Sequence, residues 1–395
     1  MNKKLFVAII MMAVAAFFYS KYVRNVPIVI PFEVINNSIL FKVEIEGETY
    51  TFLFDTGAST SISPELKQKL NLKNNGNKLS SDFYDNISTI EEVIIPELKL
   101  GPLISPQMTV DVVKPIQSFE ICGVQIDGYL GLEFFDKKVV HIDIIKKKLT
   151  IANSSHFISD ISAVPVSMSY HGNQKTPFLS LAIGNDPIKE PILFDTGSDK
   201  DLINFRLTTF QKLLKDSIIT SKNIIDTLNI NTGSGLFGPQ RDTLNYLLKI
   251  HILGIAGATL ENTTLKTFGK KNYSILGSAL LNQGTITLDL IRDKFYFSPY
   301  PIPPLNKEPV DGFKLENLSV SSVKEESDAF NKGVRVGQRL KAINSVYFDS
   351  LSKCDLYYLD LEYHFYRDTI QFIFTSDKGE LVYEYYKTEK LSETD

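Results

Sequence analysis

The chain has 395 residues, a net charge of −4 at pH 7 and no tryptophan. This length allows two or three domains with substantial cores. Nucleic-acid binding needs concentrated Lys and Arg, so the slight acidic excess argues against nucleic acid as the main partner. A hydrophobic fraction of 43% and a charged fraction of 22% argue for a folded globular protein rather than a disordered one.

The N-terminus has the pattern of an export signal. Lys3 and Lys4 precede an apolar run over 5–19, as in secretory signal peptides. The run is short for a membrane-spanning helix, which needs about 20 apolar residues. No small-x-small cleavage site follows it, so residues 1–24 are either a signal peptide or an uncleaved membrane anchor. In both cases we expect the remaining chain outside the cytoplasm, either secreted or in the cell envelope.

The first half of the chain is predicted to be mainly β. Apolar and charged residues alternate over 41–46, which indicates a half-buried strand, and an apolar strand over 50–54 follows a turn. Residues 64–72 form the best candidate helix of this region. A hairpin is expected over 139–151, with three lysines at its turn.

The same order of elements returns later in the chain. A strand over 178–183 and a short apolar strand over 191–194 precede a helix over 207–214. Another hairpin is expected over 285–297. Equivalent motifs lie about 140 residues apart, which indicates a duplicated lobe rather than a solenoid repeat.

This repeat predicts the domain boundaries. The first lobe is expected at 27–152 and the second at 160–300, with a linker over 153–176 between them. Prolines cluster over 299–309, where they disfavour helix and central strand and therefore mark another boundary. A third domain is expected at 308–390.

Each lobe carries an Asp-Thr-Gly motif directly after an apolar strand. Asp55 begins the first motif and Asp195 the second. A buried strand that leads into a tight turn holds the carboxylate in a dry position, and glycine lets two such turns approach closely. Two carboxylates at hydrogen-bonding distance share a proton, and their apparent pKa values separate. One can then accept a proton from water while the other donates to a substrate carbonyl.

A single Asp-Thr-Gly is most often a solvated turn, but two copies at matching places of a repeat agree with each other. Leu130-Gly131 and Leu276-Gly277 form a second repeated signature. With these motifs, residues 27–299 resemble the retropepsin-like and pepsin-like aspartic peptidases. In that family the second signature lies on a strand that crosses behind the catalytic turn, called the psi-loop. The resemblance implies a mainly β, bilobal acid-protease fold without a metal or organic cofactor.

The resemblance also implies a role for each motif residue. Asp55 and Asp195 are expected to activate one water molecule together, so no covalent intermediate forms. The threonines lock the two loops to each other, and the glycines offer backbone groups to the substrate. The residues expected to support the dyad are Thr56, Gly57, Thr196, Gly197 and Ser198.

The two lobes differ directly after Asp-Thr-Gly. Ser198 is expected to support the outer carboxylate oxygen with its hydroxyl, which Ala58 cannot do. Loss of a hydrogen bond to the charged form raises the pKa of a carboxyl group. We therefore expect an activity optimum less acidic than that of a gastric enzyme. Because one chain supplies both carboxylates, no homodimer is needed, and a monomer is expected.

In the family a hairpin, the flap, folds over the cleft and often carries a tyrosine. Residues 81–86 are the first-lobe candidate, with Phe83 or Tyr84 over the dyad, and 231–240 is the second-lobe equivalent. Turn composition fits a surface turn equally well. Residues 233–238 also match Gly-x-Gly-x-x-Gly, but no helix follows as a dinucleotide site requires, so a hairpin tip explains the glycines better.

Other catalytic signatures are missing from the sequence. The five histidines show no His-Glu-x-x-His spacing, so a zinc peptidase is not expected. No serine lies in a Gly-x-Ser-x-Gly motif. Cys122 and Cys354 fall in different predicted domains, so buried free thiols are expected rather than a disulfide framework.

Residues 327–344 resemble part of a PDZ domain: a short helix, a glycine, then an apolar strand that ends in Ile-Asn. Gln338 replaces the usual aspartate of this pattern. Gly312 and Phe313 lie where the carboxylate-binding loop of such a domain begins. PDZ domains bind extended peptides by adding a strand to a sheet edge, so a peptide ligand is expected. The alternative is a small packing domain that binds nothing.

Two functions remain open. The leading hypothesis is an aspartic endopeptidase that hydrolyses extended polypeptide between two β-rich lobes. The alternative is an envelope protein that binds peptides in the cleft and the PDZ groove without cutting them. Two intact Asp-Thr-Gly motifs argue against this alternative, because a protein without catalysis has no chemical need for either acid.

Overall fold

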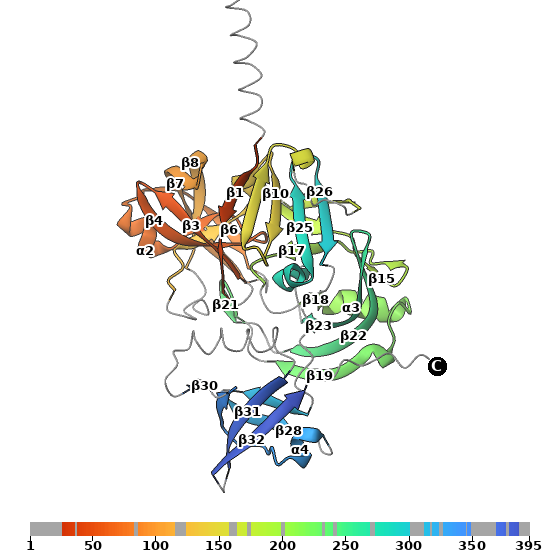
Figure 1. Cartoon of the computed structure of the whole chain (residues 1–395). Coiled ribbons are helices and arrows are strands. Elements are labelled where there is room, and N and C mark those ends of the chain that lie inside the picture. Colours follow the sequence, from red (N-terminus) through yellow and green to blue (C-terminus); the bar gives the residue numbers. More distant parts are fainter. Residues whose placement is uncertain are drawn as a thin grey trace, which may run out of the picture. The chain divides into compact units, whose positions relative to one another are not determined.

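The structure is a computed structural model of the whole chain (Figure 1). It describes residues 26–35, 38–82, 86–114, 124–157, 164–171, 175–198, 202–230, 234–239, 243–268, 273–300, 312–316, 318–323, 327–344, 346–348, 369–376 and 379–386. The predicted N-terminal signal or anchor, Phe83, Tyr84 and both cysteines lie outside these residues. Within them, no helix is both long enough and apolar enough to cross a membrane.

Contacts divide the chain into two compact units. The larger unit holds Met1–Gln117 and Gln125–Pro301, and the smaller holds Ser118–Val124 and Ile302–Asp395. Each unit has its own hydrophobic core, and the two cores share no residue.

One eight-stranded sheet forms the first lobe of the larger unit. Across the sheet its strands are β2 (Glu33–Ile35), β3 (Ser38–Ile45), β4 (Glu48–Phe54), β9 (Gly128–Leu130), β5 (Ser61–Ile62), β8 (Leu103–Val112), β7 (Ile87–Leu100) and β6 (Asn74–Ser81). Phe41 and Val43 are buried while Lys42 is exposed, so β3 shows the predicted alternation. Helix α2 (Pro64–Lys69) begins at Ser63, whose hydroxyl accepts a hydrogen bond from the Leu66 N–H.

A ten-stranded sheet forms the second lobe. In order it contains β13 (Ser169–His171), β14 (Thr176–Leu179), β17 (Ile192–Asp195), β24 (Ser274–Gly277), β18 (Ile203–Arg206), β23 (Ala258–Phe268), β22 (Thr243–Ile255), β15 (Ala182–Ile183) and β16 (Asp186–Pro187), and β19 (Ile224–Ile230) pairs with β22. Helix α3 (Leu207–Lys215) follows β18, where a helix was predicted. Two short strands, β20 (Ser234–Gly235) and β21 (Gly238–Pro239), form a small hairpin after β19.

The two lobes repeat one pairing scheme. In the first lobe β4 runs parallel to β9, β9 antiparallel to β5, and β5 parallel to β8. In the second lobe β17, β24, β18 and β23 repeat these three relations in the same order. The mainly β, bilobal fold predicted from the sequence is therefore confirmed.

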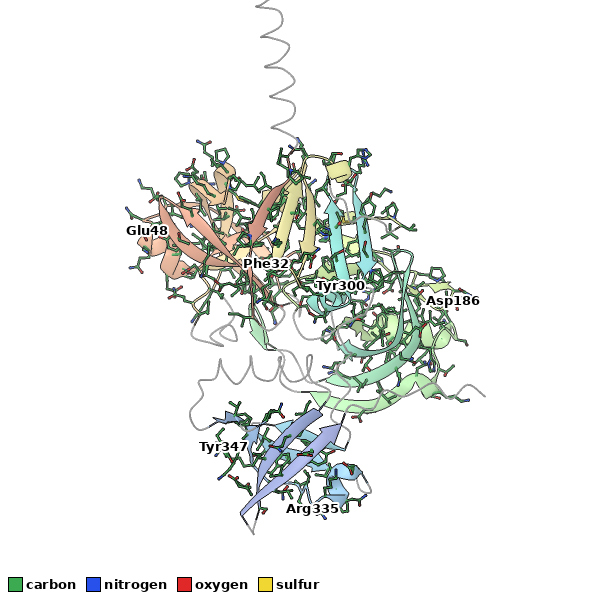
Figure 2. The ribbon with its side chains drawn as sticks, viewed as in Figure 1. Phe32, Glu48, Asp186, Tyr300, Arg335 and Tyr347 are labelled. Atoms are coloured by element: carbon green, nitrogen blue, oxygen red, sulfur yellow. The ribbon has the colours of Figure 1, made fainter. Side chains whose placement is uncertain are left out.

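A third sheet of six strands joins the lobes. Its order is β1 (Ile28–Pro31), β11 (Lys148–Ala152), β10 (Val139–Asp143), β25 (Gly284–Asp289), β26 (Lys294–Pro299) and β12 (Val166–Ser167). Strands β10 and β25, one from each predicted hairpin, lie side by side at its centre (Figure 1). There His141 Nδ1 lies 2.9 Å from the Thr287 hydroxyl. Tyr300, labelled in Figure 2, donates to Asp143 at 3.3 Å at the end of β10.

Three predicted boundaries are wrong. Helix α2 ends at Lys69 rather than at residue 72, because Asn71 takes a left-handed φ of 50° that stops the helix. The predicted strand over 178–183 is two strands, since β14 pairs with β17 whereas β15 turns to β22. The predicted linker over 153–176 contains β12 and β13, which extend two different sheets.

In its described residues, the smaller unit has its own strands and one short helix. Its elements are β27 (Phe313–Glu316), β28 (Ser319–Val323), α4 (Asp328–Asn331), β29 (Leu340–Ile343), β30 (Val346–Tyr347), β31 (Thr369–Ser376) and β32 (Gly379–Tyr386). Strands β27 and β28 pair with each other, and the other four form a sheet in the order β30-β29-β31-β32. Phe313 is buried against Phe372 and Phe374, so its ring belongs to this core. Gly312 has a φ of 117°, and a Cβ there would lie 2.4 Å from the Ser327 hydroxyl. The peptide groove at these residues stays a prediction.

Candidate active site

The local fold delivers both Asp-Thr-Gly turns to the same place. Asp55 directly follows β4, and Asp195 is the last residue of β17. The preceding Phe54 and Phe194 are fully buried, which fixes the position of each strand end. The Asp55 N–H donates to the carbonyl of Leu130 on β9 at 3.0 Å. Each turn is therefore anchored from behind by its own lobe.

The two carboxylates lie against each other's turns. A Cβ built on Gly57 would lie 2.6 Å from Cγ of Asp195, and one on Gly197 would lie 2.4 Å from Oδ2 of Asp55. Real Cβ atoms do not approach this closely, so glycine is required at both positions. Each glycine N–H also donates to Oδ1 of its own aspartate at 2.8 Å. The contacts are the same in both directions and make a symmetric dyad.

Thr56 and Thr196 hold the two turns together. The Thr56 N–H donates to the Thr196 hydroxyl oxygen at 3.0 Å, and the Thr196 N–H donates to that of Thr56 at 3.0 Å. Each hydroxyl then donates across the lobes, Thr56 to the Phe194 carbonyl at 2.7 Å and Thr196 to the Phe54 carbonyl at 2.8 Å. All four bonds are buried, and together they lock the two loops to each other.

Burial sets the electrostatics of the dyad. It raises the pKa of Asp55 well above its ordinary value, and the charge of Asp195 raises it further. The backbone N–H groups of Gly57 and Ala58 lower the pKa but do not reverse the shift. One proton is therefore held in the pair at pH values where an exposed aspartate has lost it.

The backbone of Ser198 contacts both Asp195 and Ser278. Its N–H donates to the Asp195 carbonyl at 3.3 Å, and its own carbonyl accepts from the N–H of Ser278 at 2.8 Å. The hydroxyl of Ser278 donates to that same carbonyl at 3.2 Å. The predicted support of the Asp195 carboxylate by the Ser198 hydroxyl stays a prediction.

The residues expected in the psi-loop lie on or directly after β9 and β24, the strands that pair with β4 and β17. Leu130 and Leu276 are fully buried and pair with Phe54 and Phe194, respectively. The Gly131 N–H donates to the Thr60 hydroxyl at 3.0 Å. On the other lobe, the Gly277 N–H donates to the Leu202 carbonyl at 2.9 Å. The glycine N–H is the donor in both lobes, but its acceptor is a side-chain hydroxyl in the first lobe and a backbone carbonyl in the second.

Sequence reasoning missed Glu133. Its carboxylate accepts a hydrogen bond from the backbone N–H of Thr60, at the end of the first catalytic loop. Burial raises the pKa of Glu133, although the Thr60 donors act in the opposite direction. Ala279 occupies the equivalent place in the second lobe. The sequence did contain a signal for Glu133. An acidic residue lies two positions after the Leu-Gly signature in only one of the two lobes.

Asp111 was missed as well. It is buried at the end of β8, and its backbone N–H donates to the Thr60 carbonyl at 3.1 Å. Lys78 on β6 lies 2.8 Å from its Oδ1. Burial raises the pKa of Asp111, whereas Lys78 and the hydroxyl of Ser59 lower it. Asp111 therefore connects a flap strand to the loop that follows Asp55.

The two candidate flaps meet through described residues. The Asp82 N–H donates to the Asn86 carbonyl at 2.9 Å, which closes the β6–β7 hairpin. Oδ2 of Asp82 also accepts the backbone N–H of Phe237 at 2.9 Å. Phe237 lies between β20 and β21, so the glycine-rich segment is a hairpin tip, as predicted. The expected flap residues Phe83 and Tyr84 lie outside the described residues.

Among the residues that the structure describes, no three metal-ligating side chains of His, Cys, Asp or Glu come together.

An aspartyl protease family model matches residues 41–134. The matched region includes Asp55 and the first psi-loop signature at Leu130 and Gly131. No curated protein sequence matches the chain. Among solved structures, basic 7S globulin from soybean is similar at 12% sequence identity and a TM-score of 0.39. That match covers 69% of this chain and 95% of the globulin chain.

Proposed function

We propose that the protein is an aspartic endopeptidase that hydrolyses peptide bonds between Asp55 and Asp195. The observation that carries this proposal is the reciprocal approach of the two turns. Gly57 lies against the Asp195 carboxylate, and Gly197 lies against that of Asp55. Two carboxylates held this closely share one proton. A protein that only bound peptides would have no need to bury two acids against each other.

The chemistry follows from the shared proton. The ionised carboxylate accepts a proton from a water molecule as that water attacks the peptide carbonyl carbon. The protonated carboxyl donates to the carbonyl oxygen, so the tetrahedral species forms without a full negative charge. Collapse of the tetrahedral species breaks the C–N bond. The protonated carboxyl gives its proton to the leaving nitrogen, and the ionised carboxylate takes a proton from a hydroxyl of the tetrahedral carbon, so the dyad again holds a single proton. The N–H groups of Gly57 and Gly197 hold the two carboxylates in place throughout.

The substrate class is an extended polypeptide, and the basic start with its apolar run supports action outside the cytoplasm. The carboxylates come from two lobes of one chain, so the dyad is complete in a monomer. Peptide binding by the C-terminal unit is part of the same proposal and rests on the sequence pattern alone.

The test is cleavage of a mixed peptide library by the purified protein, followed by mass spectrometry from acid to neutral pH. The parent is expected to cut within peptides. Asp55→Asn and Asp195→Asn should each lose activity by about 10³-fold or more, because the shared proton is gone. Asp186→Asn is the matched control, since Asp186 is exposed at the start of β16.

Two results would overturn the proposal. One is the absence of cleavage at every pH by parent protein that circular dichroism shows to be folded. The other is undiminished cleavage by Asp55→Asn or Asp195→Asn, which would trace the activity to another site or to a contaminant.

A further inference from the structure

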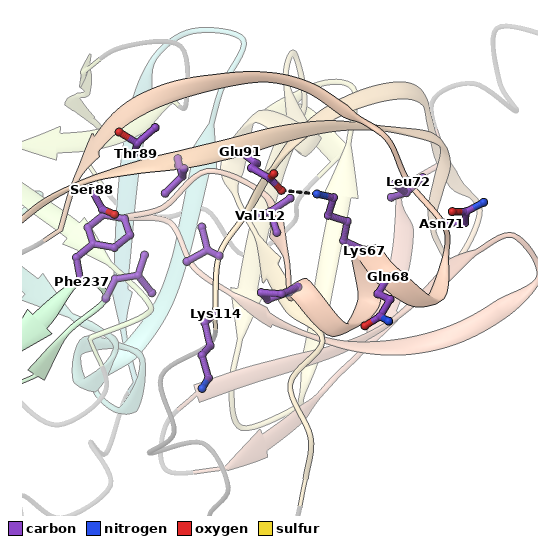
Figure 3. Close-up of a pocket in the computed structure, with 14 residues that line it drawn as sticks. Lys67, Gln68, Asn71, Leu72, Ser88, Thr89, Glu91, Val112, Lys114 and Phe237 are labelled. Atoms are coloured by element: carbon purple, nitrogen blue, oxygen red, sulfur yellow. Dashed lines mark hydrogen bonds and ion pairs between the residues drawn. The ribbon is translucent and has the colours of Figure 1, made fainter.

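The first lobe contains a pocket of about 630 Å³ beside the flap hairpin. Helix α2, the start of β7 and the chain that follows β8 form three of its sides (Figure 3). Leu236 and Phe237, from the β20–β21 hairpin of the second lobe, form the fourth. A pocket of this size is in the range that accepts several side chains or a small ligand.

The pocket lies where two strands separate. β7 pairs with β8 only as far as Glu91 opposite Val112, and then continues towards the flap with β6 alone. The chain after β8 follows β5 instead, because the Val113 N–H donates to the Ile62 carbonyl at 2.9 Å. One edge of β7 between residues 87 and 90 therefore has no neighbouring strand in the described part of this sheet.

Strand alternation shows which backbone groups face that edge. Asp82 and Asn86 form a hydrogen-bonded pair across the β6–β7 hairpin. In an antiparallel ladder such pairs alternate, so Ser88 and Ile90 direct their N–H and C=O groups towards β6. Thr89, between them, directs its N–H and C=O groups to the open edge. An extended peptide laid there would gain both hydrogen bonds.

The side chains around this edge define the chemistry of the peptide. Ile90 and Phe237 contribute apolar surface, and Leu72 and Val112 add to it. The ammonium group of Lys67 forms an ion pair with the Glu91 carboxylate, which the dashed line in Figure 3 marks. Lys114 is exposed at the rim, and within the described residues no carboxylate pairs with it. As far as the described residues show, the pocket thus combines an apolar wall with a lysine that no carboxylate pairs.

We propose that this pocket is a second polypeptide-binding site, which holds an extended substrate segment that carries a large apolar residue next to an acidic one. The segment pairs with the open edge at Thr89, places its apolar side chain against Phe237, and sets its carboxylate near Lys114. The inference rests on the proposed peptidase function for its substrate, but the pocket itself is separate from the dyad residues.

The test uses an introduced tryptophan as a fluorescent reporter, because the chain has no tryptophan of its own. The protein has no tryptophan, so Phe237→Trp gives a single indole in the pocket wall. Combined with Asp55→Asn, it reports binding without cleavage. The probes are acetyl-Leu-Phe-Glu-Leu-amide and its partner with Lys in place of Glu. The Glu peptide should change the emission at a concentration about two- to fivefold lower, as an exposed ion pair predicts.

Three further substitutions locate the binding. Lys114→Glu should reverse the preference between the two peptides, whereas Lys73→Glu, an exposed control outside the pocket, should leave it unchanged. Thr89→Pro removes one N–H that no described strand uses, so it should weaken both peptides by about two- to tenfold. A preference for the Glu peptide that Lys114→Glu does not reverse overturns the proposal. So does a tryptophan emission that neither peptide changes.

The two proposals fail separately. A parent that cleaves peptides while the reporter protein binds neither probe refutes the pocket alone. If the reporter protein binds with the expected preference but the parent protein never cleaves, the proposed peptidase function is refuted. The protein is then a peptide-binding protein.

Discussion

At the residue scale, Asp55 makes stability depend on pH. Burial and Asp195 raise its folded pKa, so between its ordinary value and that raised value the folded state keeps a proton that the unfolded state releases. Stability is therefore fully present below the unfolded pKa and is lost as pH rises through the folded pKa. Asp55→Asn removes this loss of stability at higher pH. The asparagine side chain keeps an oxygen that can accept the hydrogen bond from the Gly57 N–H.

We expect Asp55→Asn to have a higher Tm than the parent at pH 7, and the difference to shrink towards pH 4. Thermal melts monitored by circular dichroism across this range measure it. A difference that grows towards acid would show that the pKa of Asp55 is lowered, not raised.

The glycines of the dyad give a second prediction at this scale. A Cβ at position 57 would lie within 2.8 Å of both Asp195 carboxylate oxygens, so Gly57→Ala must push the two turns apart. We expect a loss of about 1–3 kcal/mol of stability and of about 100-fold in kcat/KM. Gly76→Ala is the matched control, because its Cβ would meet only Glu92 at 3.5 Å. Equal activity in both variants would contradict the close approach.

At the scale of elements, the crossed threonines bind the first lobe to the second. Thr56→Val leaves the Phe194 carbonyl and the Thr196 N–H buried without partners. Each unsatisfied group costs about 1–3 kcal/mol, so the free energy of unfolding should fall by about 2–5 kcal/mol. Thr56→Ser keeps the hydroxyl and should stay within about 1 kcal/mol of the parent. Urea denaturation measures both, and equal losses in the two variants would refute the hydroxyl bonds.

Elements also show how far the sequence predicts this fold. The strands before Asp55 and Asp195, the psi-loop glycines and the two joining hairpins were predictable, because each is marked by a short local pattern. The contact between Asp82 and Phe237 was not, because 155 positions separate the two residues and no local pattern indicates that the two candidate flaps meet. Asp111 and Glu133 were missed for the same physical reason: each supports the catalytic loop from a distant strand or turn. The break in the predicted strand over 178–183 depends on which partner strand is nearby, which the local pattern does not specify.

At the scale of the whole molecule, the two cores predict two folding units. No buried residue of the core around Phe41 and Phe194 belongs to the core around Phe313 and Phe372. Scanning calorimetry of the full chain should therefore show two transitions. Phe372→Ala should lower only one of them, by an amount typical of the roughly 3–5 kcal/mol that a buried phenylalanine contributes. A single transition that shifts as a whole would contradict the division.

We infer that Asp55 and Asp195 act as one proton-sharing pair. The most direct test is the pH dependence of kcat/KM for one cleaved peptide, with both Asn variants measured at the parent optimum. We expect a bell-shaped profile with two well-separated apparent pKa values, a maximum above about pH 3, and activity lost in both variants. Substantial cleavage by either variant, or a profile with a single titration, would contradict it.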